Sequence, residues 1–349
     1  AVPLPLPQVQ VVDMREEVKT GTRGLLSRPF QRALASCLQR GEQALLFLNR
    51  RGAAPAVQCR RCGASLRCRR CTIALTYHSA EGRVVCHQCG ERRALPGACP
   101  ACGGALRFLG AGTQRVADEV GRAFGVPVLR WDRDAARERK AHQEVMARFS
   151  GGEVPVLVGT QMVAKGLHFP RVTMVGVVLA DQGLHLPDFR AAERAFQLLC
   201  QVAGRAGRED LPGQVFLQTY SPDHYAVRAA AAQDFEAFYQ RELAYRQEQR
   251  LPPFSRLVRL LYRHPNLALC QREAERVALY IKEERDRQGL GEIDLIGPAP
   301  AFPERVRGHY RWHLLLRSPP ARHEDLLDLL MELRLPPGWA VDVDPISLV

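Results

Sequence analysis

The sequence predicts an α/β domain with a parallel sheet, interrupted by a metal-binding insertion and followed by a smaller α+β domain. Apolar runs alternate with amphipathic helical stretches before and after residues 59–102, which is typical of a parallel sheet covered by helices on both faces. Eight of the eleven cysteines lie within 59–102. From about residue 250 the order becomes β-α-β-β-α-β, which is ferredoxin-like. At 349 residues, the chain is long enough for two or three domains.

The first strand of the α/β domain is expected over 43–52, where an apolar run ends in polar residues and glycine. Thr113 is the expected N-cap of the first helix after the insertion. Ser221 is the expected cap of a later helix, with Pro222 in its first position. The elements between them are strands at 126–131, 154–160, 172–181 and 213–220 and helices at 113–124, 135–149 and 189–203.

The clustered cysteines form four C-x-x-C pairs. Two thiolates at this spacing can hold one face of a tetrahedral ion. Nothing in the sequence indicates secretion, which argues against disulfides, and redox C-x-x-C motifs occur singly. Eight thiolates make two closed four-thiolate sites, so we expect two structural zinc ions.

Sequential and nested groupings of the four pairs are both open. Residues 72–86 have the pattern of a hairpin with its turn at 79–82, which would bring the second pair beside the third and favours nesting. His87, inside the third pair, is interpreted as a surface side chain. The nested grouping assigns Cys59, Cys62, Cys99 and Cys102 to zinc 1 and Cys68, Cys71, Cys86 and Cys89 to zinc 2.

The chain carries a net charge of +12 with a pI of about 9.5. Such an excess favours polyanionic partners, most often nucleic acid. No run of 18 apolar residues occurs, so we expect no membrane span, and the first residues lack the features of a signal peptide. We therefore expect a cytoplasmic protein. The start without Met suggests a piece of a longer protein.

Two motifs indicate phosphate chemistry. "VLVGTQMVAKGLHFP" (156–170) places small and polar residues just beyond a strand's carboxyl end, where ligands bind in open α/β sheets. "QVAGRAGR" (201–208) sets Arg205 and Arg208 among glycines, and guanidinium forks match phosphate and can neutralise charge in phosphoryl transfer. A helix end with two surface arginines is the alternative, and the neighbouring 156–170 motif argues against it.

These motifs, together with "LLFLNRRG" (45–52) and the eight cysteines between them, resemble the PriA family of primosomal replication-restart helicases, in helicase superfamily two. The likeness runs from about residue 10 to the end and includes "LPPFSR", "IGPAPA", "RWHLLLR" and "DVDPI". It implies a RecA-like second helicase lobe that follows a first lobe. The implied division is lobe 2 over 1–52, an inserted zinc module over 53–106, the rest of lobe 2 over 107–245, and a C-terminal DNA-binding domain over 246–349.

The resemblance also implies roles for single residues. The 156–170 motif corresponds to the helicase motif that contacts DNA and couples this contact to the bound nucleotide. The 201–208 motif corresponds to the one that points arginine at the γ-phosphate across an interlobe cleft, with Arg208 as the arginine finger. The implied coupling and DNA contacts are Thr160, Gln161 and Lys165, and the implied catalytic residues are Gln201, Arg205 and Arg208. The sequence departs from the pattern at Leu167, where the family has a polar residue, and at His168, where other superfamily-two helicases often have Asp.

No Gly-Lys dipeptide occurs in the chain, so it has no G-x-x-x-x-G-K-[ST] phosphate loop. Asp181 ends an apolar strand as the acid of a magnesium site does, but no second acid follows. We therefore expect this chain alone not to hydrolyse ATP, and ATP with Mg²⁺ to bind only if a first helicase lobe is supplied.

In the C-terminal domain we expect a proline-rich loop over 298–303 and a strand over 310–317. Arg311 and Trp312 are candidate contacts for single-stranded DNA, because arginine holds phosphate and aromatic rings stack on bases. Alternation also allows Trp312 to face the core. The other expected elements are strands at 256–263, 293–297 and 339–345 and helices at 267–288 and 324–334.

The resemblance implies a replication-restart protein for primosome assembly that recognises stalled forks and helps to reload the replicative helicase. The full-length family is an ATP-dependent 3′-to-5′ DNA helicase. The implied partners are single-stranded and forked DNA, single-strand-binding protein and helicase-loading proteins, with the chain a monomer. The alternatives are a non-catalytic fork-binding scaffold and a zinc-ribbon RNA-binding or transcription accessory protein, which would leave the helicase motifs unexplained.

Overall fold

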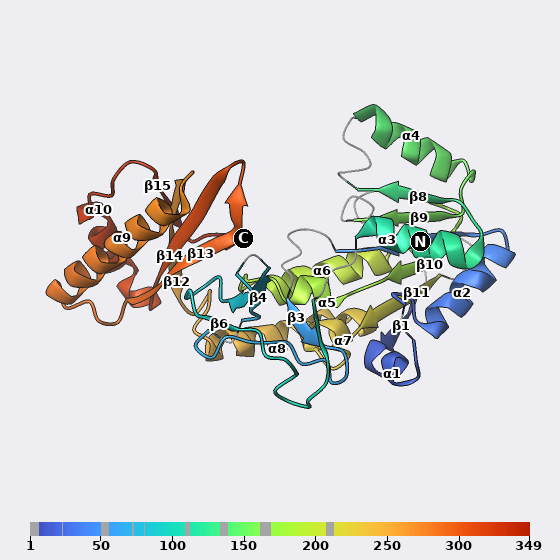
Figure 1. The fold of residues 1–349 in the computed structure, drawn as a ribbon, viewed down its shortest axis with the longest axis horizontal. Coiled ribbons are helices and arrows are strands. Elements are labelled where there is room, and N and C mark those ends of the chain that lie inside the picture. The colour runs from blue at the N-terminus through green and yellow to red at the C-terminus, as the bar shows by residue number, and fades with distance from the viewer. Residues whose placement is uncertain are drawn as a thin grey trace.

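The computed structural model describes residues 7–22, 24–49, 56–71, 73–79, 81–108, 112–132, 139–160, 169–206 and 213–349. Within them, six strands form one parallel sheet in the order β1-β11-β10-β2-β9-β8 (Figure 1). These strands are β1 (Gln8–Asp13), β2 (Gln43–Phe47), β8 (Val128–Trp131), β9 (Val156–Gly159), β10 (Val172–Val177) and β11 (Gln214–Thr219).

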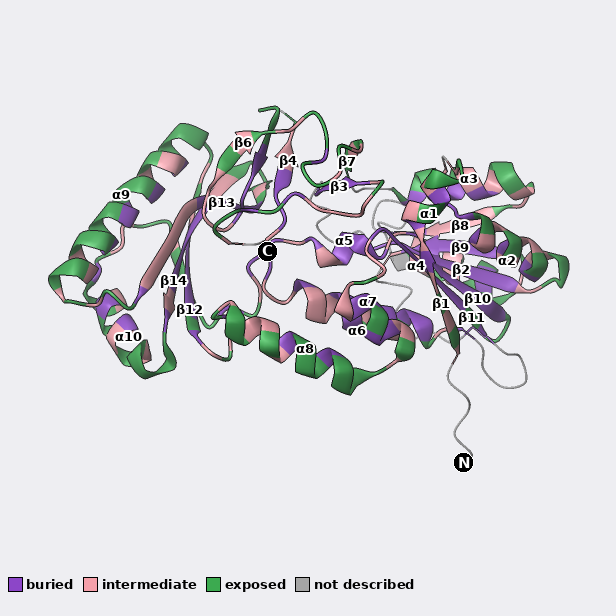
Figure 2. Cartoon of the chain, turned by 90° about the horizontal axis from the view of Figure 1, so that it is seen from below, coloured by how far each residue is buried: buried purple, intermediate pink, exposed green. Residues whose placement is uncertain are grey.

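The central strands are buried because helices cover both faces of the sheet, as Figure 2 shows. Leu45 and Phe47 of β2 pack with helices α4, α6, α7 and α8 on one face. Leu46, between them, packs with α1, α2 and α3 on the other. No helix among the described residues has the length and apolar content to cross a membrane. The helices are α1 (Met14–Lys19), α2 (Arg28–Gln39), α3 (Thr113–Phe124), α4 (Arg139–Ser150), α5 (Asp181–Leu184), α6 (Ala191–Ala203), α7 (Tyr225–Ala232) and α8 (Phe235–Glu248).

Both helix caps predicted for this domain are wrong. Thr113 is the first residue of α3, after Gly112 as N-cap, and its hydroxyl donates to the buried carboxylate of Asp132. Helix α7 begins at Tyr225 with His224 as its N-cap. Ser221 lies before the N-cap, and its hydroxyl accepts from Gln58 of the insertion at 2.9 Å.

The cysteine-rich insertion contains two small antiparallel sheets, β3-β7 and β4-β5-β6. The predicted hairpin is present, with Thr76 opposite Val85. Strands β3 and β7 pair where the insertion leaves and re-enters the α/β domain. Figure 1 shows the insertion between that domain and the C-terminal domain. Its strands are β3 (Val57–Cys59), β4 (Thr76–His78), β5 (Arg83–Val85), β6 (Arg92–Ala94) and β7 (Leu106–Phe108).

The C-terminal domain has the predicted β-α-β-β-α-β order, as an antiparallel sheet β13-β14-β12-β15 with two helices packed on one face. The predicted loop over 298–303 is wrong, because strand β13 continues through it. The prolines are tolerated since β13 is an edge strand, and two register shifts interrupt its pairing with β14. The elements are β12 (Arg256–His264), α9 (Leu267–Arg287), β13 (Asp294–Val306), β14 (His309–Ser318), a 3-10 turn (Pro320–Arg322), α10 (His323–Glu332) and β15 (Trp339–Val343).

Candidate functional site

Two groups of four cysteine sulfurs lie in the insertion, each with all four Sγ atoms within 4.8 Å of one another. The Cys59–Cys102 and Cys68–Cys89 sulfur pairs are each 3.6 Å apart. A disulfide would need about 2.05 Å, whereas a tetrahedral ion with Zn–S bonds of about 2.3 Å requires about 3.8 Å between sulfurs. The donor sets therefore fit two zinc ions. They have the nested grouping: Cys59, Cys62, Cys99 and Cys102 in the first, and Cys68, Cys71, Cys86 and Cys89 in the second.

A glycine follows the second cysteine in three of the four pairs, at 63, 90 and 103. All three glycines have positive φ, between 71° and 78°, a region that favours glycine. Each donates its N–H to the carbonyl of the first cysteine of its pair, at 2.8–3.0 Å. This turn points both sulfurs to the same side, and the extended motif C-x-x-C-G was the sequence signal for it.

The first metal site is anchored on the α/β domain. The side-chain amide of Gln58 donates to the carbonyl of Gly63 and the hydroxyl of Ser221, both at 2.9 Å, and to Asp181 Oδ1 at 3.2 Å. Asp181 also accepts the N–H of Tyr220 at 2.9 Å. Its buried carboxylate thus joins the insertion to the ends of β10 and β11. A Cβ at Gly63 would overlap the Tyr220 carbonyl.

The second metal site is anchored on the C-terminal domain, and the prediction that His87 is a surface side chain is wrong. His87 is 2% exposed, and its Nδ1 donates to the carbonyl of Pro300 at 2.8 Å. His313 donates back to the His87 carbonyl at 2.7 Å. The imidazole of His78 links His87 Nε2 (3.1 Å) to the carboxylate of Glu304 (3.2 Å). Burial of the His87 ring lowers its pKa to about 4, so the ring is neutral in this interface.

The structure describes only some of the residues predicted to act on nucleotide. Thr160 follows β9 directly, and its N–H donates to the carbonyl of Trp131 at 3.3 Å. Gln201 is exposed on α6, and Arg205 is partly buried just after the C-cap Gly204. The remaining predicted residues, Gln161, Lys165 and Arg208, lie outside the described residues. So do Leu167 and His168, the two departures from the family pattern.

The beginning of α6, the helix whose other end carries Gln201, is held by charged contacts. Glu193 accepts from Arg190 at 2.6 Å and from Arg246 of α8 at 2.7 Å. Burial alone would raise the pKa of Glu193, but hydrogen bonds from the two arginines and their positive charges lower it to about 2. Helix α6 is thereby fixed to α8.

The predicted DNA platform in the C-terminal domain is only partly available. Trp312 is 4% exposed and packs with Cys270 and Ala274 under α9, so the prediction that its ring stacks on bases is wrong in this conformation. Strand alternation put Trp312 on one face, and α9 covers that face. Arg311 lies on the other face, half-buried, and donates to the carbonyl of Pro303 at 3.2 Å. Burial lowers the pKa of Arg311 from its ordinary value.

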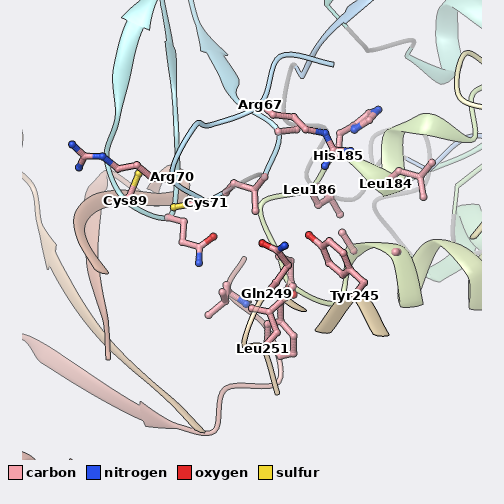
Figure 3. Close-up of a pocket in the computed structure, with 18 of the residues that line it drawn as sticks. Arg67, Arg70, Cys71, Cys89, Leu184, His185, Leu186, Tyr245, Gln249 and Leu251 are labelled. Carbon is pink, nitrogen blue, oxygen red and sulfur yellow. Dashed lines mark hydrogen bonds between the residues drawn. The ribbon is translucent and has the colours of Figure 1, made fainter. Parts of the chain in front are cut away.

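A cavity of about 580 Å³ lies where the insertion, the α5–α6 segment, α8 and the C-terminal domain meet (Figure 3). We call it the junction pocket. Sequence reasoning missed it because its walls come from segments that lie far apart in the chain. The only local signal was the spacing of Arg241, Tyr245 and Gln249, four residues apart, which places them on one face of a helix.

Three family models match separate parts of the chain. The helicase conserved C-terminal domain matches residues 113–210, the PriA DNA helicase Cys-rich region domain matches residues 68–93, and the primosomal protein N C-terminal domain matches residues 247–346. The three matches correspond to the α/β domain, the zinc insertion and the ferredoxin-like domain described above.

Curated relatives match across all three parts. Replication restart protein PriA of Bacillus subtilis is 41% identical over 314 residues, which are 89% of this chain and 38% of that protein. The same-named protein of Synechocystis is 39% identical over 99% of this chain and 42% of its own length. That of Treponema pallidum is 40% identical over 98% of this chain and 52% of its own length. This chain therefore spans about half or less of each relative, and it belongs to the PriA family, carrying that family's second helicase lobe, zinc-binding Cys-rich region and C-terminal domain.

Proposed function

We propose that this chain binds DNA in replication restart, where it recognises stalled forks and helps to reload the replicative helicase. The observation that carries the proposal is the combination in one chain of a helicase lobe, a closed two-zinc insertion and a primosomal C-terminal domain, in that family's order. The net charge of +12 suits a polyanionic partner. Its partners would be forked and single-stranded DNA, single-strand-binding protein and helicase-loading proteins.

In the proposed nucleotide cycle, this chain supplies one half of an interlobe site. Gln201, Arg205 and Arg208 face the phosphates of ATP bound by a first helicase lobe, and arginine neutralises charge as the γ-phosphoryl group leaves. Thr160, Gln161 and Lys165 contact the DNA backbone and couple it to the nucleotide. With that lobe, the protein is a 3′-to-5′ helicase. Without it, the chain does not hydrolyse ATP.

The proposed working unit is a cytoplasmic monomer. Lobe 2 comprises 1–52 and 107–245, the zinc module 53–106, and the DNA-binding domain 246–349. The pairing of β3 with β7 and the change of topology near residue 250 support this division.

Fluorescence anisotropy with a fork, a duplex, a single strand and an RNA hairpin of equal charge tests the proposal. We expect the fork to bind most tightly, with affinity that falls steeply as salt rises. Equal or better binding of the RNA hairpin would favour the RNA-binding alternative instead. Phosphate release from ATP, measured with and without the fork, should stay at the buffer background for the purified chain, and DNA-stimulated turnover would contradict the proposed division of the site.

A further inference from the structure

The junction pocket is built from parts of the chain whose positions are fixed by other contacts. Its zinc-module wall includes Cys71 and Cys89 of the second metal site. The wall from the C-terminal domain includes Ile296 and Gly297 of β13, the strand that the second site anchors. The α8 wall is tied to α6 by Arg246. The pocket is therefore a preformed cavity, and its volume is within the roughly 300–1,000 Å³ of ligand sites.

The charge around the pocket is positive, because its acids are already paired. Asp188 accepts from Arg194 at 2.9 Å, and Asp223 pairs with Arg15 at 3.2 Å. Arg241, by contrast, lines the pocket, is exposed, and forms no ion pair with a described residue. An anion that enters the pocket therefore meets a guanidinium fork whose donors are available.

Polar and aromatic groups face the cavity beside this charge. Tyr245 and Gln249 follow Arg241 along α8, and Figure 3 shows their side chains pointing into the cavity, with Arg67 extending over it toward His185. His185 is 6% exposed, and its buried Nε2 has no hydrogen-bond partner among the described residues.

We propose that the junction pocket holds one nucleotide unit of single-stranded DNA. The backbone phosphate lies against Arg241 and Arg67, and the base stacks on Tyr245 with its polar edge toward Gln249. This inference rests on the proposed DNA-binding function and specifies where a strand passes. An acidic peptide would use the arginines but not the ring, whereas every base has a π face that stacks on an aromatic side chain. The combination therefore favours a nucleotide.

The test uses the whole chain and fluorescein-labelled oligothymidylate in an anisotropy titration. Arg241→Glu is compared with Arg272→Glu, an equal charge change on the exposed face of α9. We expect Arg241→Glu to weaken binding by roughly tenfold more than its control and to reduce the salt dependence by about one phosphate contact. Tyr245→Ala should also lower the affinity for the oligonucleotide roughly tenfold. Two control variants should bind as wild type does: Tyr245→Phe, which keeps the ring, and Tyr239→Ala, which removes an exposed tyrosine on the same helix.

A bromodeoxyuridine oligonucleotide supplies an independent readout, since photocrosslinks should map by mass spectrometry to the α8 peptide that carries Tyr245. Equal losses in both arginine variants, or unchanged binding by Tyr245→Ala, would overturn the inference. The inference would also be overturned if a glutamate-rich peptide bound wild type but not Arg241→Glu, while Arg241→Glu still bound DNA as wild type does. If wild type itself fails to bind DNA, the proposed function fails. If wild type binds and the pocket variants match their controls, only the pocket assignment fails.

Discussion

His87→Ala should weaken the interface between the C-terminal domain and the zinc module without removing the metal. The substitution deletes the Nδ1–H that donates to the buried carbonyl of Pro300 at 2.8 Å, and an unsatisfied buried acceptor costs about 1–3 kcal/mol. It also deletes an edge-to-face contact with Phe302, whose ring centroid is 5.3 Å away, worth about 0.5–1.5 kcal/mol. We therefore expect the interface to lose about 2–4 kcal/mol.

Urea unfolding followed by tryptophan fluorescence measures this loss, because Trp312 and Trp339 both lie in the C-terminal domain. Hydrogen exchange in β13 reports on the interface directly. The matched control is His309→Ala, since His309 is exposed and its side chain bonds to the carbonyl of Arg307 in its own turn. Metal analysis should give two zinc ions per chain in both variants. The reasoning would be refuted if the free energies of unfolding of the two variants lay within about 0.5 kcal/mol of each other and hydrogen exchange in β13 were equal in both.

Three further results are expected. Removal of zinc with a chelator should abolish the protection of β13 as well as that of the insertion, measured by hydrogen exchange, and intact β13 protection would contradict this. Gly90→Ala should destabilise the chain in urea more than Gly82→Ala, because both glycines have positive φ but only a Cβ at 90 would meet a backbone atom, the Pro298 carbonyl at 2.5 Å. Glu193→Gln should cost about 1–3 kcal/mol near neutral pH. Because the pKa of Glu193 is depressed from 4.5 to about 2, this contribution is complete above about pH 4.5 and disappears as pH falls through about 2, so acid titrations of the variant and wild type should converge there.

The features that could be predicted from sequence are those set by local spacing. Two cysteines three positions apart on a tight turn already define half of a tetrahedral site, and the hairpin over 72–86 then selects the grouping. The apolar run of β2 indicates burial by itself. The helical periods of α3 and α6 are equally local, so their places in the chain were predictable even where the cap residue was not.

The features that sequence reasoning missed depend on contacts between distant segments. Strand β1 pairs with β11, with Gln8 opposite Gln214, and its polar alternation gives no sign of that partner. His87 is buried in a contact with the C-terminal domain, where it donates to the carbonyl of Pro300, 213 positions away. Alternation predicts that Trp312 shares a face with Tyr310, but not which face α9 covers.

The insertion is fastened at both ends, and this has a mechanical consequence. Gln58 binds groups that follow β10 and β11, at the sheet edge where open α/β folds receive their ligands. His87, at the far end, holds the sheet of the C-terminal domain. A tilt of those strand ends would swing the insertion as a lever arm and carry the distant sheet with it. The stiffness of that arm would be set by eight metal–sulfur bonds, so the range of the movement depends on how completely the two ions are bound.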